Sequence, residues 1–128
     1  MVKNHRVPFK ISYLDHGYSE IVGLFHVKKE ELVLEFEQNS QFTEGSSSGV
    51  QEISLPIAEI ESVQYRKKWI SAVIEIEARS MRLLNSVPGA EQGRCELKIK
   101  RKHRKEAEHA VSTARVLISE QRLEELEE

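Results

Sequence analysis

The side chains in this chain that could carry chemistry are few and far apart. None of the five histidines has another at helical spacing, and they are scattered along the sequence: His5, His16, His26, His103 and His109. A metal site needs several such ligands close together, so we expect neither a metal site nor a bound cofactor. The single cysteine, Cys95, occupies an inward position of an alternating segment, which favours core packing over nucleophilic catalysis.

Two pairs of glutamates lie two residues apart, Glu35 with Glu37 and Glu75 with Glu77. Residues two apart in a strand share one face, and here that face is the polar one. We expect these carboxylates to be solvated charges, not an acid and base pair. The chain also lacks a glycine-rich loop that could cradle a phosphate. The sequence therefore predicts a protein that is not an enzyme.

Basic residues surround the only tryptophan of the chain. This candidate anionic-ligand site consists of Arg66, Lys67, Lys68 and Trp69, together with Arg79 and Arg82. An exposed tryptophan beside cations suits an acidic peptide, a phosphate or a lipid headgroup. The alternative is a Trp69 ring that folds back on the sheet with its N–H hydrogen-bonded.

The last quarter of the chain has the period of a helix. Apolar residues at spacings of three and four predict a helix over about 103–126: Ala107, Ala110, Val111, Ala114, Leu117 and Ile118. A second stripe follows the opposite side, with the spacing of a packed helix pair: Ser112, Val116, Ser119, Leu123 and Leu126. This outer stripe is either a solvated tail or a surface for a partner helix, which could belong to a second copy.

The charges of this predicted helix run against its backbone dipole. Basic residues crowd its start, within 98–105, and acidic residues crowd its end, within 120–128. The dipole favours the reverse order by about 0.3–1 kcal/mol per charge. Either both ends are simply solvated, or two antiparallel copies place each basic start beside an acidic end.

Everything before the helix reads as short strands. Alternation predicts seven strands, over 7–14, 19–27, 31–37, 51–55, 61–66, 72–78 and 94–100. Residues 38–49 and 87–93 read as loops, and alternation through Leu84 favours a continuation of the sixth strand. Gly23, within the second strand, is expected to mark a bend or bulge. The prediction is a mainly β, α+β fold.

Length and composition set further bounds. A chain of 128 residues with a net charge of −2 predicts one domain, residues 1–128, and argues against a general nucleic-acid binder. One cysteine excludes an internal disulfide and indicates a cytoplasmic setting. We expect no signal peptide, since no apolar run follows the first charges, and no membrane-spanning segment.

Four segments in this order resemble the bacterial pleckstrin-homology-like (PH-like) and GRAM-like families: 23–27, 32–36, 53–56 and 60–63. The segments 78–82 and 87–89 also resemble an uncharacterised prokaryotic PH-like family. The resemblance implies a seven-stranded antiparallel barrel capped by the long C-terminal helix. Members that bind inositol lipids carry basic residues around the first hairpin. Here that hairpin holds Asp15 and His16, with only Lys10 before it, so that lipid signature is absent.

The leading expectation is a non-catalytic interaction module that acts through protein contacts, first of all with itself through the outer stripe. The alternative is a peripheral binder of an anionic lipid headgroup or another anionic ligand. It would use the basic turn near Trp69 and the basic stretch 98–105.

Overall fold

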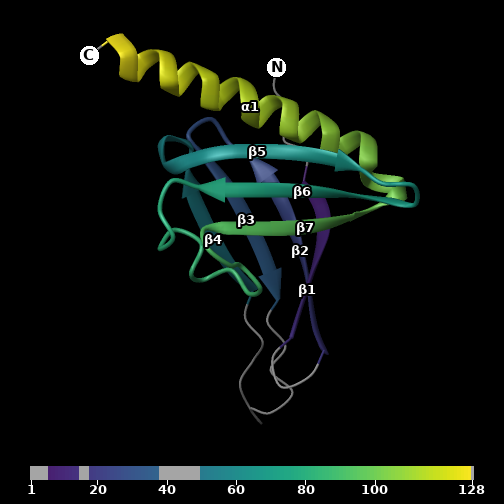
Figure 1. The fold of residues 1–128 in the computed structure, drawn as a ribbon. Coiled ribbons are helices and arrows are strands. Elements are labelled where there is room, and N and C mark those ends of the chain that lie inside the picture. Colours follow the sequence, from purple (N-terminus) through teal and green to yellow (C-terminus); the bar gives the residue numbers. More distant parts are fainter. Residues whose placement is uncertain (1–5, 15–17, 38–49, 128) are drawn as a thin grey trace.

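The computed structural model describes residues 6–14, 18–37 and 50–127. Seven strands are followed by one long helix, with two short 3₁₀ helices between elements (Figure 1). The elements are β1 (Val7–Leu14), β2 (Tyr18–Val27), β3 (Glu31–Glu37), β4 (Val50–Pro56), η1 (Ile57–Glu59), β5 (Ile60–Lys67), β6 (Ser71–Ala78), β7 (Arg94–Lys100), η2 (Arg101–His103) and α1 (Arg104–Glu127). All seven predicted strands and the helix are confirmed, with ends within about one residue.

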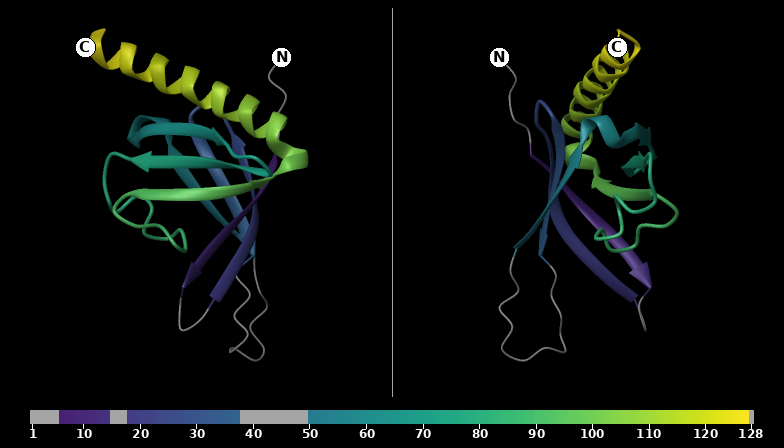
Figure 2. Two further views of the ribbon diagram at one scale, coloured as in Figure 1. Left: turned by 45° about the vertical axis from the view of Figure 1, so that its right-hand side comes forward. Right: turned by 90° about the vertical axis from the view of Figure 1, so that its left-hand side faces the viewer.

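All strands belong to one antiparallel sheet in the order β4-β3-β2-β1-β7-β6-β5. The sheet curls into two layers that cross, β1–β4 behind and β5–β7 in front (Figures 1 and 2). The layers join where β1 meets β7, with Lys10 opposite Lys98. Each lysine has its own partner: Lys10 pairs with Glu20 at 3.4 Å, and Lys98 Nζ donates to Ser12 Oγ at 3.3 Å.

No ladder joins the edge strands β4 and β5 in the described ranges, so the strands do not form the closed ring that was expected. Between these two strands the chain passes through η1. Helix α1 packs chiefly against β5 and η1 (Figure 2). The helix thus covers the open side of the curled sheet.

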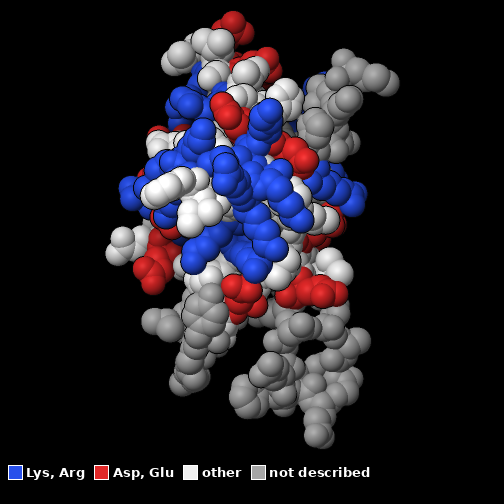
Figure 3. All heavy atoms as spheres, turned by 90° about the vertical axis from the view of Figure 1, so that its right-hand side faces the viewer, with Lys and Arg blue, Asp and Glu red and all other residues white. Residues whose placement is uncertain are grey.

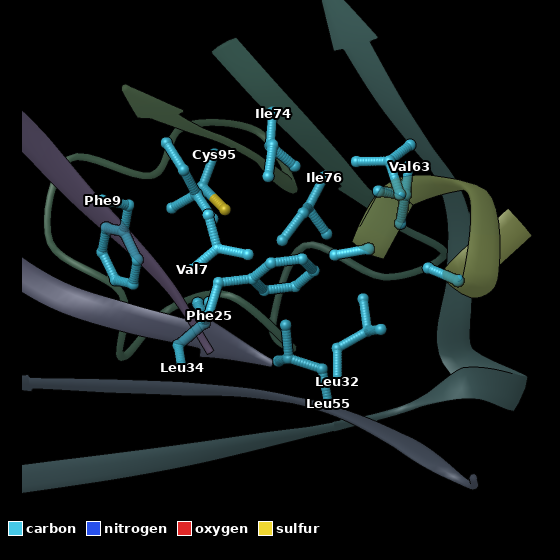
Figure 4. Packing of buried hydrophobic residues seen from close by; sticks show 14 of the residues in the cluster. Val7, Phe9, Phe25, Leu32, Leu34, Leu55, Val63, Ile74, Ile76 and Cys95 are labelled. Carbon is cyan, nitrogen blue, oxygen red and sulfur yellow. The ribbon is translucent and has the colours of Figure 1, made fainter. Parts of the chain in front are cut away.

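The core lies between the two layers, and Figure 4 shows aromatic and aliphatic side chains converging there. Strand β7 shows how the sequence builds it: Cys95, Leu97 and Ile99 are buried while the residues between them are exposed. The inward stripe of α1 is rich in alanine, and Ala107 and Ala114 are completely buried. Small side chains let the helix axis approach the sheet closely.

Gly23 lies in a regular ladder, with Phe9 of β1 on one side and Phe36 of β3 on the other. The bulge expected there is not found. A Cβ atom at this position would lie 2.7 Å from the Phe9 ring and closer still to the Glu35 carbonyl oxygen. Glycine is therefore needed for space, not for a bend.

The predicted continuation of β6 is wrong, because the chain turns at Arg79. The Arg79 N–H donates to the Glu59 carbonyl at 2.9 Å, which pulls the backbone away from the β6 direction. The segment then forms turns, one of them closed by the Val87 N–H on the Leu84 carbonyl at 2.9 Å. Both side chains join the core. Leu84 and Val87 are three residues apart, which in a turn lets both side chains reach the core. This spacing, and not the strand-like alternation of 81–84, matches the structure.

The end of α1 makes its contacts through charges. The last buried residue of the helix is Ile118. Beyond it, Arg79 binds both carboxylate oxygens of Glu125 at 3.2 and 3.3 Å, and Arg122 donates to the main-chain oxygen of Glu61. The far end of the helix is thus tied to the sheet by ion pairs rather than by apolar packing.

Candidate functional site

The β5–β6 hairpin has an apolar apex. The Lys68 N–H donates to the Ser71 carbonyl at 2.9 Å, which closes the hairpin around two residues. These are Trp69 and Ile70, whose exposed fractions are 91% and 73%. The alternative in which Trp69 folds back on the sheet is wrong. Two large apolar side chains therefore stand in solvent side by side.

The start of α1 lies against this apex. Arg104, the first residue of the helix, donates from Nη1 to the carbonyl oxygens of Lys68 at 3.1 Å and Trp69 at 3.4 Å. Strand β7 leads to the same place, since Lys100 is opposite Ser71. The register of the sheet therefore brings the basic turn and the basic stretch of 98–105 together.

We call the resulting cluster the basic surface and define it by the lysines and arginines of 67–68 and 100–105: Lys67, Lys68, Lys100, Arg101, Lys102, Arg104 and Lys105. Lys98 is not part of it, because its Nζ donates to Ser12 Oγ. All are exposed except Arg104, which is half-buried. Figure 3 looks onto this end of the molecule and shows lysine and arginine atoms across most of it, with acidic atoms mainly around the margin. The surface therefore concentrates positive charge on a chain whose net charge is −2.

The basic surface is hollowed. An open depression of about 630 Å³ is lined by Arg101, Lys102, Arg104, Lys105 and Glu106. Beside it, the buried Nδ1 atom of His103 has no hydrogen-bond partner among the residues described, and Glu106 Oε2 is 4.0 Å away. Cationic side chains that converge on an open hollow can bind phosphate or carboxylate groups.

Tyr65 of β5 lies close to the start of α1, since the charges of Glu108 and Arg104 act on its phenol. Its phenol has a raised pKa, first because of burial and then because of the negative charge of Glu108, while Arg104 acts in the opposite direction. Tyr65 therefore stays neutral at physiological pH, and the positive charge of the surface is not reduced there.

The remaining predicted ligand residues lie elsewhere. Arg66 points to the outer face of the sheet, where Nη2 is 3.3 Å from Glu75 and 3.1 Å from Glu96. Arg79 and Arg82 follow the other end of β6, about 25 Å away along an eight-residue strand. The structure thus brings Lys67, Lys68 and Trp69 to one site, but not the three arginines.

Sequence reasoning missed Ile70 and the bracing role of Arg104. A signal for Ile70 was present, because the apex of a tight hairpin ordinarily carries glycine, asparagine or aspartate. No local signal existed for Arg104, whose contacts are 35 and 36 residues away.

The predicted outer stripe of α1 is exposed along its length. Val116, Leu123 and Leu126 expose 57%, 61% and 81% of their surface, and Ser112 and Ser119 are exposed between them. The core-facing stripe is confirmed on the other side, with Leu117 partly buried. The helix therefore presents an apolar stripe that its own sheet does not cover.

One expectation about the glutamates needs correction. Glu35 is not simply a solvated charge, because its Oε1 lies 3.1 Å from Nε2 of His26, which is buried. His26 and Glu35 are on adjacent strands, two register positions apart in the β2–β3 ladder, so they are diagonal neighbours on one face of the sheet. This pair is part of the packing of that ladder. Glu75 likewise has a partner in Arg66.

Cys95 is buried, as predicted, and burial raises the pKa of its thiol to about 12. In the described ranges, no three histidine, cysteine or acidic side chains are grouped so that they could hold a metal ion. Comparisons with protein-family models, curated proteins and solved structures find no match to this chain. Within the described part of the chain, no helix has the length and apolar character needed to cross a membrane.

Proposed function

We propose that this chain is a non-catalytic, peripheral binder of anionic, phosphate-bearing ligands, and that the basic surface is its binding site. The observation that carries the proposal is the convergence of two basic segments, from the β5–β6 turn and from the start of α1. Arg104 joins the two segments through its bonds to the Lys68 and Trp69 carbonyls.

Electrostatics supports this assignment. Like charges so close together disfavour one another, and neither strand pairing nor core packing requires them at this end. The basic residues at the start of α1 also oppose the helix dipole. An arrangement that costs stability within the fold gains from an anionic partner, which would offset both repulsions.

We also propose that the fold is PH-like and that the protein works in the cytoplasm. The strand order, with the helix covering the open side, supports the first point. The proposed site differs from the inositol-lipid site that the resemblance implies, because it is formed by the β5–β6 hairpin and α1 and not by the first hairpin.

The proposal is tested by titrating the full chain with inositol hexakisphosphate. Amide NMR spectra monitor the titration, once at low salt and once at physiological salt. We expect shifts confined to 67–71 and 100–106, and weaker binding at higher salt because exposed charges are screened. Lys68→Gln/Lys102→Gln should weaken binding by tenfold or more.

The matched control is Lys28→Gln/Lys29→Gln. These exposed lysines belong to the β2–β3 turn, next to Glu30, whose carbonyl accepts from the Ile57 N–H at 2.9 Å. This places them near the start of β5, far from Trp69. If both double variants weaken binding equally, the effect is one of net charge and the proposed site is wrong.

A second candidate function is self-association through the outer stripe of α1. It is supported by the exposure of Val116, Leu123 and Leu126 at helical spacing. In an antiparallel pair of copies, a register that sets Val116 opposite Leu123 also sets Arg115 opposite Glu124. That register sets residues 120–127 opposite 112–119. In this register the basic start of one helix does not face the acidic end of the other. The expected attraction between helix ends is therefore replaced by an Arg115–Glu124 pair.

Light scattering tests this candidate on the intact chain and on Val116→Glu/Leu123→Glu. The expected result is an oligomer that the double substitution converts to a folded monomer. Met81→Glu is the control, because Met81 is an equally exposed apolar residue outside α1. A monomeric intact chain at micromolar concentrations and above contradicts self-association.

A further inference from the structure

We infer that the basic surface docks on the surface of an anionic phospholipid bilayer, with Trp69 and Ile70 entering the interfacial layer. This inference rests on the proposed function and specifies its partner. It draws on three observations beyond positive charge: the exposure of the hairpin apex, its composition and its bracing.

The apex is apolar where the fold does not require it. Trp69 and Ile70 are both largely exposed, and neither contributes to the core. Tight hairpins are stabilised by small polar residues and glycine at these positions. The residues present weaken solubility without stabilising the turn, so they are better explained by a partner that covers them.

A tryptophan and an aliphatic residue within a ring of cations match the interface of an anionic membrane. Tryptophan is enriched at the headgroup level, where its ring is in an apolar layer and its N–H remains near water. Lysines and arginines gain from the negative surface potential of anionic lipids. The strength of peripheral binding grows with the apolar area that is buried and with the attraction to anionic lipids, and this surface supplies both contributions.

The apex is also held in place. The hairpin is closed by the Lys68–Ser71 hydrogen bond, and Arg104 binds the carbonyls of Lys68 and Trp69. A wedge that is already ordered loses less conformational entropy when it inserts. Arg104 is therefore a positioning residue, whereas Lys68, Lys102 and Lys105 are exposed and available to headgroups.

Other anionic partners fit less well. A small phosphate compound could occupy the hollow between 101 and 106 but would leave Ile70 in water. Single-stranded nucleic acid is bound on several stacking aromatic side chains, and the two segments that form this surface carry one tryptophan and no phenylalanine or tyrosine. A bilayer is the partner that accounts for both apex residues and the cations around them.

The test uses the full chain with vesicles of phosphatidylcholine, with and without phosphatidylserine. Trp69 is the only tryptophan, so its fluorescence reports on the apex directly. We expect a blue shift and quenching by lipids brominated on the acyl chains, only when phosphatidylserine is present. Ile70→Ser should lower partitioning several-fold and Trp69→Ser/Ile70→Ser about tenfold or more, measured by sedimentation.

Each lysine neutralised on the basic surface should lower partitioning about fivefold. Met81→Ser is the control for loss of an exposed apolar side chain elsewhere, and it should partition like the intact chain. Circular dichroism checks that each variant is folded. Trp69→Ser/Ile70→Ser should lower partitioning into vesicles far more than it lowers binding of inositol hexakisphosphate, because that variant keeps every cation.

Four results would overturn the inference. Binding of inositol hexakisphosphate without any partitioning into anionic vesicles would leave the proposed function standing and remove the bilayer as partner. Partitioning that does not depend on Trp69 and Ile70 would show that the apex does not insert. Tighter binding to nucleic acid than to vesicles at the same salt would assign the surface to another partner. Failure to bind any of these anions removes the proposed function as well.

Discussion

The guanidinium of Arg104 bonds to the main-chain oxygen of Lys68, so the first residue of α1 holds the apex of a hairpin 36 residues earlier in the chain. The contact is exposed and makes only a modest contribution to folding, about 1 kcal/mol or less. Its consequence is positional. It fixes the distance between Trp69 and the cations of 101–105.

Replacing Arg104 should therefore affect the hairpin more than the fold. Arg104→Lys keeps the positive charge but lacks the planar guanidinium that reaches two carbonyls. We expect faster rotation of the Trp69 ring by fluorescence anisotropy and faster amide exchange at 69–70, with nearly unchanged unfolding free energy. Neutralising Lys105, which is exposed on the same turn, should leave the anisotropy unchanged. Equal anisotropy in Arg104→Lys and the intact chain would show that the brace is not needed.

Gly23→Ala should destabilise the sheet. The added methyl group would collide with the Phe9 ring and with the Glu35 carbonyl, and main chain cannot move aside without breaking the β2–β3 ladder. We expect a loss of about 1–3 kcal/mol in the free energy of unfolding, measured by urea denaturation. Ser54→Ala, at an exposed position of β4, is the control and should change stability by less than about 0.5 kcal/mol. An unchanged free energy of unfolding in Gly23→Ala would mean that β1 and β3 can separate locally.

Cys95 should make the fold sensitive to alkali. Burial is the main reason that its pKa rises from 9.0 to about 12, and Glu75 and Glu96 add to the effect. Below pH 9 both the folded and the unfolded chain hold the proton, so this thiol causes no pH dependence. Between pH 9 and pH 12 only the unfolded chain releases it. The free energy of unfolding should therefore fall by about 1.4 kcal/mol per pH unit in that window.

Comparison with Cys95→Ala isolates this contribution from lysines and tyrosines, which titrate in the same range. The stability advantage of the intact chain over Cys95→Ala at pH 8 should shrink at pH 10. An advantage that stays constant would show that the thiol ionises equally readily in both states.

The ion pairs at the end of α1 should matter for local order more than for overall stability. Arg79 and Glu125 are both partly exposed, so their pair is screened and worth less than about 1 kcal/mol. We expect Glu125→Gln to speed amide exchange in the last two turns of α1 while the rest of the helix is unaffected. Glu124→Gln, on the same turn, is the control. Raising salt should reproduce the effect in the intact chain.

Local patterns were sufficient for most of the fold. Strict alternation of apolar and polar residues predicts both ends of β7 correctly, and apolar spacings of three and four predict α1. The apolar pattern gave the wrong prediction where a few residues fit both the period of a strand and that of a turn. Met81 to Leu84 alternate like a strand, but main-chain bonds made by Arg79 and Val87 turn the chain there.

The candidate site could be predicted only in part, because strand pairing brings together segments that are far apart in the sequence. The turn residues Lys67, Lys68 and Trp69 are adjacent in sequence and were found together. The sequence predicts Arg79 at the same site, yet the length of β6 places it at the opposite end of the sheet. The pairing of His26 with Glu35 depends on the register between β2 and β3, which cannot be inferred from the sequence of either strand alone.

The order of charges along α1 also affects the electric field around the molecule. Arg104 and Lys105 open the helix, while Glu124, Glu125 and Glu127 close it, about 36 Å away over 24 residues. Charges in this order repel the helix dipole, yet they point the same way as that dipole and add to its field. The helix therefore carries a large electric moment along its axis, although the net charge of the whole chain is only −2. Near a negatively charged surface, this moment would turn the molecule so that its basic end, which carries Trp69, faces that surface.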